Sequence, residues 1–170
     1  MTGPRRQQKP PLKGLVPALM GAALLATVAV VPSFRGMAAT TERIAVDPLS
    51  GLALAGYDPV AYFTEGVASP GRPDLEYDHA GAPWRFRNEG NRAAFMNNPD
   101  VYAPRFGGYD PVHLARGVPM PGDPRLWTLR GQRLYLFYTA ETRDRFAGDA
   151  ERVLTAAEQH WPGAQRTLTP

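Results

Sequence analysis

Hydrophobic residues fall into one long apolar run near the N-terminus and two matching sets of short alternating segments further along. The run covers residues 15–31. The alternating segments predict two β-hairpins, 75–79 with 84–87 and 126–129 with 133–138. In 84–87 the alternation places Trp84 and Phe86 toward the core and their arginine neighbours toward solvent. Segment 133–138 is apolar almost throughout, which predicts a central strand.

A short helix is expected ahead of each hairpin. Residues 58–59 and 110–111 are both Asp-Pro. Asp is a favourable N-cap, and Pro suits the first helical position because its missing N–H would have no partner there. Gly66 and Gly117 follow at suitable distances to end these helices.

A further helix is expected after each hairpin, capped by Asn88 in the first case and Thr139 in the second. The last helix is predicted to start at Asp149, with apolar side chains at helical spacing as far as Trp161. The Pro-Gly pair at 162–163 predicts its end, and residues 164–170 then form a short tail.

These elements follow an internal repeat. The string Tyr-Asp-Pro-Val occurs at 57–60 and at 109–112, and with a shift of 51 or 52 the match extends to Phe86 with Phe137 and Phe95 with Phe146. The repeat units cover about 51–104 and 105–163. Because half of this length has too little core to fold alone, we expect one α+β domain over 40–163, built from two repeated units of short helix, hairpin and helix.

The N-terminal residues 1–39 have the pattern of an export segment. Basic residues precede the apolar run, and small residues follow it at Gly36, Ala38 and Ala39. As a helix the run would measure about 25 Å, somewhat less than the roughly 30 Å hydrocarbon core of a bilayer. A cleaved signal peptide and a retained membrane anchor both remain open. Either places the domain on the periplasmic side, with the inner membrane as a partner if the helix is retained.

Charge is divided unevenly between this leader and the rest. Residues 1–39 contain both lysines and no acid, whereas the remainder has fourteen arginines against sixteen acids, a net charge of −2. The basic pI therefore belongs to the leader. A nucleic-acid surface is not expected, since it would need cations gathered on the folded part.

Cysteine is absent from the sequence. This excludes disulfides, thiolate metal sites and thiol catalysis, so the domain depends on its core for stability.

The motifs around the repeat resemble those of the YHS-domain family. The resemblance rests on GYDPVAYF, an aromatic hairpin and the later NP-x-x-Y in the same order, and it covers residues 51–162. The resemblance implies a short exported module, of a family whose paired cysteines are associated with metals. It also implies that the second unit of this chain is a diverged copy of the first.

Several positions depart from that family pattern. Ala61 and His113 stand where the metal-associated members have the cysteine of Asp-Pro-Val-Cys, and Asp110 stands where exported relatives often carry cysteine or selenocysteine. Asn91 and Thr142 occupy another family cysteine position. Sulfur-based chemistry therefore cannot be transferred to this chain.

The candidate site lies where a concave surface is expected between the two units. The predicted ligand pocket consists of Tyr57, Tyr109, Asp110 and His113. Without sulfur, copper or zinc would need His113, Asp110 and His79 as ligands. The histidines lack His-x-x-x-His spacing, so no bound cofactor is the main expectation and a metal is the alternative.

No catalytic signature is present: the sequence lacks G-x-S-x-G, H-E-x-x-H and a phosphate-binding glycine loop. Asp58 and Asp110 are explained as helix caps. We therefore expect a binding or assembly module rather than an enzyme, with an unidentified protein or small molecule as its partner. A periplasmic metal-handling accessory is the second hypothesis.

Overall fold

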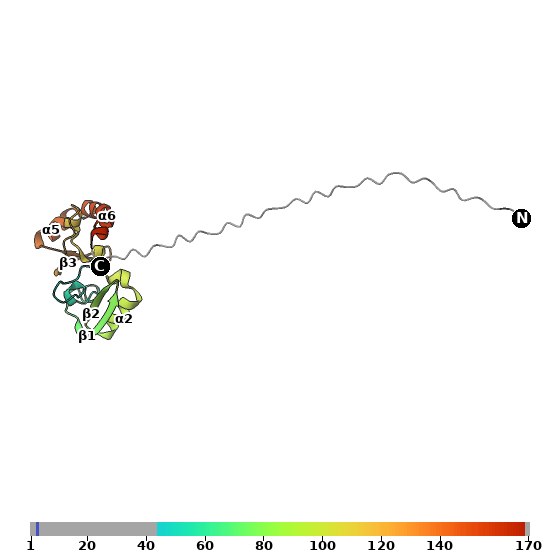
Figure 1. Cartoon of the computed structure of the whole chain (residues 1–170), viewed down its shortest axis with the longest axis horizontal. Coiled ribbons are helices and arrows are strands. Elements are labelled where there is room, and N and C mark those ends of the chain that lie inside the picture. The colour runs from blue at the N-terminus through green and yellow to red at the C-terminus, as the bar shows by residue number, and fades with distance from the viewer. Residues whose placement is uncertain (1–2, 4–43, 169–170) are drawn as a thin grey trace. The chain divides into compact units, whose positions relative to one another are not determined.

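The structure, a computed structural model, describes Gly3 and residues 44–168 (Figure 1). The chain divides into a segment Met1–Met37 and a unit Ala38–Pro170. The predicted apolar helix of the leader lies outside the described residues. No helix among those residues is long and apolar enough to cross a membrane.

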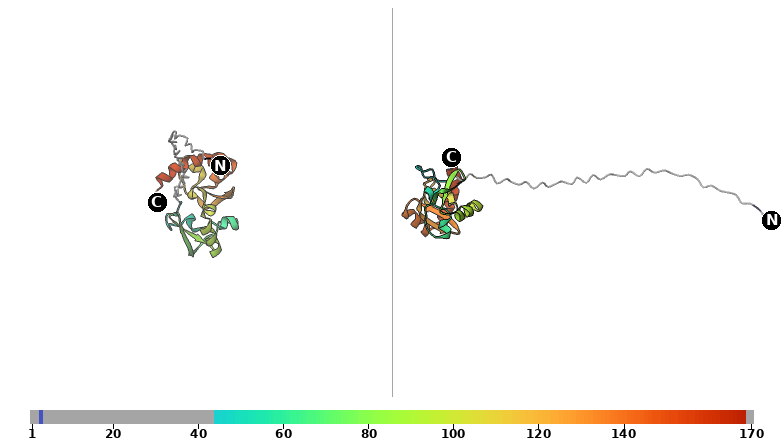
Figure 2. Two further views of the ribbon diagram at one scale, coloured as in Figure 1. Left: turned by 90° about the vertical axis from the view of Figure 1, so that its right-hand side faces the viewer. Right: turned by 90° about the horizontal axis from the view of Figure 1, so that it is seen from below.

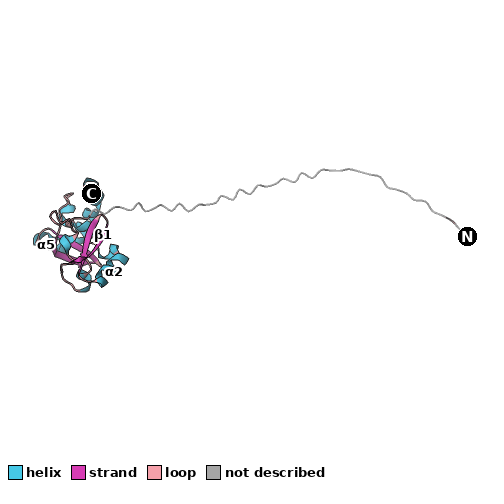
Figure 3. Cartoon of the chain, turned by 60° about the horizontal axis from the view of Figure 1, so that its bottom comes forward, coloured by secondary structure: helices cyan, strands magenta, loops and turns pink. Residues whose placement is uncertain are grey.

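The described part has a mixed α+β fold in which one order of elements occurs twice, as predicted. The first repeat contains η1 (Leu54–Gly56), α1 (Ala61–Thr64), β1 (Arg72–His79), β2 (Ala82–Phe86), α2 (Glu89–Asn97) and α3 (Pro99–Tyr102). The second contains η2 (Arg105–Gly108), α4 (Pro111–Leu114), β3 (Asp123–Arg130), β4 (Arg133–Phe137), α5 (Ala140–Gly148) and α6 (Ala150–Thr167). The repeats form neighbouring lobes (Figure 2), and in the view of Figure 3 helices α2 and α5 lie on either side of the strands.

Each hairpin is an antiparallel pair closed by a two-residue turn. Ala80 and Gly81 in the first turn, and Gly131 and Gln132 in the second, all have positive φ, as type I′ turns require. Both hairpins also contain a register shift near the start of the first strand. The shared irregularity supports a common plan for the two repeats.

The core positions of the first hairpin agree with the predicted alternation. Trp84 and Phe86 are fully buried, whereas Arg85 is half-buried and Arg87 exposed. The indole N–H of Trp84 donates to the carbonyl of His79 at 3.0 Å, so the polar atom of this buried side chain is satisfied.

Strand β4 differs from the prediction in its pairing. It pairs with β3 alone in a two-stranded sheet, so the expectation of a central strand was wrong. It is nevertheless buried on both faces, because alternate side chains enter different cores: Leu134 and Leu136 join the first, and Tyr135 and Phe137 join the second. The continuous apolar sequence reflects burial between two cores rather than between two neighbouring strands.

Tyr62 also ties the repeats together. Its ring meets Trp127 edge-on at a centroid distance of 5.2 Å, and its hydroxyl donates to the carbonyl of Pro124 at 2.9 Å. Burial raises the pKa of Tyr62 well above its usual value. The second repeat thus supplies side chains that complete the core of the first.

Helix α6 extends beyond the predicted end. It continues through Pro162 to Thr167, so the expected stop at 162–163 and the tail from 164 were wrong over this range. Ala164 is buried in the second core, and Leu168 packs against it. Burial of this last turn outweighs the hydrogen bond that Pro162 cannot make.

Candidate functional site

Asp58, in the first copy of the repeated motif, is a fully buried carboxylate. One oxygen accepts the backbone N–H of Val60 at 2.8 Å. The other accepts the backbone N–H of Arg87 at 2.8 Å and the side-chain amide of Asn91 at 2.6 Å. The carboxylate therefore joins the start of α1 to the end of β2 and to α2.

Asp110 repeats this arrangement and is also fully buried. Its Oδ1 accepts the backbone N–H groups of Val112 at 2.7 Å and His113 at 3.3 Å. Its Oδ2 accepts the N–H of Tyr138 at 2.7 Å and the hydroxyl of Thr142 at 2.6 Å. Asp110 thus caps α4, as predicted, and also connects it to β4 and α5.

The predicted N-cap is confirmed for Asp110 but not for Asp58: helix α1 begins only at Ala61, with Val60 as its N-cap residue and no side-chain cap, so Asp58 accepts the N–H of Val60 just ahead of the helix. The prediction was also incomplete. Asn91 and Thr142, which stand at a cysteine position of the family pattern, each donate a side-chain hydrogen bond to the repeated aspartate. Sequence reasoning missed this role. The paired recurrence of a polar residue 32 or 33 positions after each aspartate was the available signal.

His113 lies beside Asp110 in α4. Its Nδ1 is 3.2 Å from Oδ2 of Asp110, but it lacks the alignment of a hydrogen bond and is buried with no hydrogen-bond partner. The ring meets Tyr138 edge-on at 5.7 Å. About a quarter of the side chain is exposed (26%), and Nδ1 is not part of that surface.

The other predicted site residues lie elsewhere. Tyr57 packs against the first core, and Tyr109 is buried in the second with its ring 6.0 Å from that of Trp161. His79 is half-buried on the ring of Phe95 at 5.5 Å. Of the four residues of the predicted pocket, Asp110 and His113 lie side by side at α4, with His113 Nδ1 3.2 Å from Asp110 Oδ2.

The described residues contain no group of three or more His, Asp and Glu side chains placed to hold a metal. Asp110 already accepts four hydrogen bonds, which uses the lone pairs that an ion would need. The arrangement thus does not favour Asp110 as a ligand, and the predicted copper or zinc site stays a prediction.

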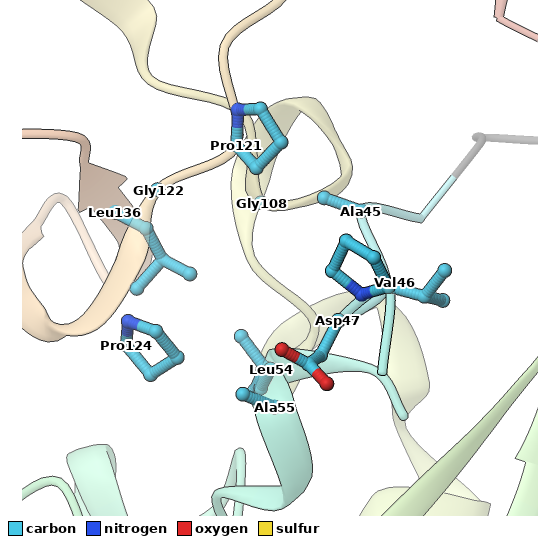
Figure 4. Close-up of a pocket in the computed structure, with 11 residues that line it drawn as sticks. Ala45, Val46, Asp47, Leu54, Ala55, Gly108, Pro121, Gly122, Pro124 and Leu136 are labelled. Atoms are coloured by element: carbon cyan, nitrogen blue, oxygen red, sulfur yellow. The ribbon is translucent and has the colours of Figure 1, made fainter. Parts of the chain in front are cut away.

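A hollow does exist between the repeats, but its lining differs from the prediction (Figure 4). It measures about 160 Å³ and its lining is mainly apolar: Ala45, Val46, Asp47, Pro48, Leu54, Ala55, Gly108, Pro121, Gly122, Pro124 and Leu136. The carboxylate of Asp47 accepts hydrogen bonds from Leu49 and Ser50. This charge is thus already satisfied by its own loop.

Two adjoining hollows of another kind lie at α4, α5 and α6. One measures about 300 Å³ and the other about 190 Å³, and they share Val112, Arg116 and Arg145 in their linings. Arg152 lines the larger one, and His113 the smaller. We call this pair of hollows the basic hollow.

Charges in the basic hollow are only partly paired. Arg145 donates to Glu141 at 2.8 Å, and Arg152 lies 3.9 Å from Asp149. Arg116 is exposed, and among the described residues its side chain has no ion-pair or hydrogen-bond partner. Sequence reasoning did not single out these arginines, because the contact between α4 and α6 that gathers them is not visible in a linear pattern.

Comparisons of the chain with models of known protein families, with curated proteins and with solved structures find no match. The resemblance to the YHS-domain family therefore rests on the motifs alone.

Proposed function

We propose that the protein is an exported or membrane-tethered, YHS-like binding module without catalytic activity, and that it binds a small ligand in the basic hollow of its second repeat. The motif resemblance and the leader pattern support the first part. We also propose that the apolar run in residues 1–39 forms a helix ahead of the two-repeat domain.

One observation carries the binding site: Arg116 stands at a concave surface with no ion-pair partner among the described residues. Small apolar side chains lie beside it, because Val112, Ala115 and Ala156 line the larger hollow. A few placed polar groups over an apolar floor are the usual composition of a small-molecule site.

The buried aspartates do not form an acid–base pair that a substrate could reach. Asp58 and Asp110 hold backbone and side-chain donors in the interior, and both have no exposed surface. A general acid or base must reach its substrate within hydrogen-bonding distance. These carboxylates act instead as internal connectors between helix and hairpin.

The binding proposal can be tested by amide NMR on the full chain in a nonionic detergent. A set of neutral, anionic and cationic small molecules is added, with the amide signals of Ala115, Arg116 and Val153 as reporters. We expect at least one compound to shift these signals in a saturable manner. A set without any such compound would count against the proposal.

Ala156→Leu serves as a blocking variant, since Ala156 lines the larger hollow and Leu is a good helix former. Thr155→Leu, at the exposed neighbouring position of α6, is its matched control. We expect the first to abolish the shifts and the second to retain them. Mass spectrometry of the mature chain then tells whether residues 1–39 are removed.

A further inference from the structure

We infer that the basic hollow selects a small organic anion, with a carboxylate or phosphate group on a short aliphatic chain. This inference rests on the proposed function, because it names the ligand class for the same site.

The first repeat provides an internal comparison for the charge of the hollow. With the shift of 51, Glu65 corresponds to Arg116 and Arg87 corresponds to Tyr138. In the first repeat Arg87 forms an ion pair with Glu65 and also donates to Ser69 at 3.2 Å. At the equivalent place, the first repeat therefore has an ion pair, Arg87 with Glu65, whose net charge is zero.

The second repeat has lost both members of that pair. The position of the acid is taken by Arg116, and the position of the base by Tyr138, whose side chain is uncharged. A guanidinium therefore stands where a satisfied ion pair stood, and nothing among the described residues replaces its carboxylate. An anion from solution would supply that missing partner.

Two further arginines add to the positive charge. Arg145 stands where α2 has Ala94, and Arg152 follows in α6. Their acidic neighbours, Glu141 and Asp149, are well exposed, and exposed pairs of this kind are weak. The charged side chains that line the hollow are three arginines and two acids, a net charge of +1 without the fully buried Asp110, whose carboxylate accepts the hydroxyl of Thr142.

The shape and chemistry of the hollow limit the anion. The planar fork of a guanidinium matches the oxygens of a carboxylate or a phosphate. The larger hollow is about 300 Å³ and is lined by Val112, Ala115, Val153 and Ala156, which suits a short aliphatic chain rather than a bare ion or a lipid tail.

The test compares probes of equal length and different charge on the full chain in nonionic detergent. Butyrate, butyramide and butylammonium are titrated to about 20 mM, with ethyl phosphate as a second anion, and binding is followed at the amide signals of Ala115 and Val153. Removing one charge-assisted hydrogen bond corresponds to about a tenfold loss of affinity. We expect butyrate or ethyl phosphate to bind at least about tenfold more tightly than butyramide, and butylammonium not to bind.

Variants locate the charge that matters. Arg116→Gln should weaken butyrate binding about tenfold. Arg143→Gln, in α5 beside Asp144 and outside the lining of both hollows, is the matched control and should leave binding unchanged. The double change Arg116→Glu with Tyr138→Arg rebuilds the ion pair of the first repeat, and it should abolish anion binding while the circular dichroism spectrum stays that of the wild type.

The outcomes separate the two proposals. Equal binding of butyramide and butyrate at the reporter amides, insensitive to Arg116→Gln, overturns the inference about charge and leaves the binding proposal standing. No saturable shift with any of the four probes overturns the inference, and the broader compound set then decides the proposed function. Selective anion binding lost in Arg116→Gln supports both.

Discussion

Replacing Asp110 with Asn tests whether one buried carboxylate organises the second repeat. The change keeps the size of the side chain but puts an NH2 group in place of one oxygen. In the wild type, the N–H of Tyr138 and the hydroxyl of Thr142 donate to Oδ2 at 2.7 and 2.6 Å. If the NH2 group takes the place of Oδ2, it faces these two donors. The backbone N–H has no other orientation available and loses its acceptor.

The expected cost follows from these contacts. A buried donor left without an acceptor costs about 1–3 kcal/mol, and the remaining hydrogen bonds weaken because they are no longer assisted by charge. Relief from burying a charge offsets part of this loss. We therefore expect Asp110→Asn to lower the free energy of unfolding by about 3 kcal/mol.

The assay is urea unfolding at pH 7 of residues 38–170, followed by tryptophan fluorescence and by circular dichroism. Asp144→Asn is the control: its carboxylate is exposed and lies 3.7 Å from Arg143, so a change below about 0.5 kcal/mol is expected. Thr142→Val should cost less in the Asp110→Asn background than in the wild type, because the two side chains share a hydrogen bond. Similar values for Asp110→Asn and Asp144→Asn would refute the assignment of Asp110 as an organising acceptor.

Two further predictions concern stability. Burial raises the pKa of Tyr62, so its phenol stabilises the fold fully below about pH 10 and progressively less above it. Above that pH the free energy of unfolding of the wild type should fall by about 1.4 kcal/mol per pH unit more than that of Tyr62→Phe. Parallel slopes for the two proteins in urea unfolding between pH 9 and 11 would contradict this. A Cβ added at Gly122 would lie 2.5 Å from Cβ of Leu136, so Gly122→Ala should cost about 3 kcal/mol, whereas Gly148, with open space around it, should tolerate Ala with a gain of about 0.5 kcal/mol. Thermal unfolding compares the pair, and equal melting temperatures would exclude a close contact at Gly122.

Much of the fold was predictable because local signals and the repeat agreed. Asp-Pro, the glycine-containing turns and the caps Asn88 and Thr139 are short-range features, and each acts within three or four residues. The errors at β4 and at Pro162 have a tertiary origin. Burial by a second core and packing of the last turn of α6 are set by distant segments, and neither alters the local pattern.

Less of the candidate site was predictable. Asp110 and His113 are three residues apart on one helical turn, so their proximity follows from helix geometry. Tyr57 and Tyr109 were grouped with them on a general expectation about interfaces, and His79 as a possible metal ligand. The structure places each against a core of its own repeat. Arg145 and Arg152 come from α5 and α6, and Arg116 comes from the turn after α4, so their grouping depends on how these elements pack.

The two-sided burial of β4 has a consequence for how the domain loses its structure. Opening either lobe removes partners from the same strand, so partial unfolding of one lobe weakens the other. Heat capacity measurements should thus show a single calorimetric transition, with equal calorimetric and van't Hoff enthalpies. In amide exchange, the slowest protons of both lobes should share one opening free energy, as expected when a duplicated chain has become one cooperative unit.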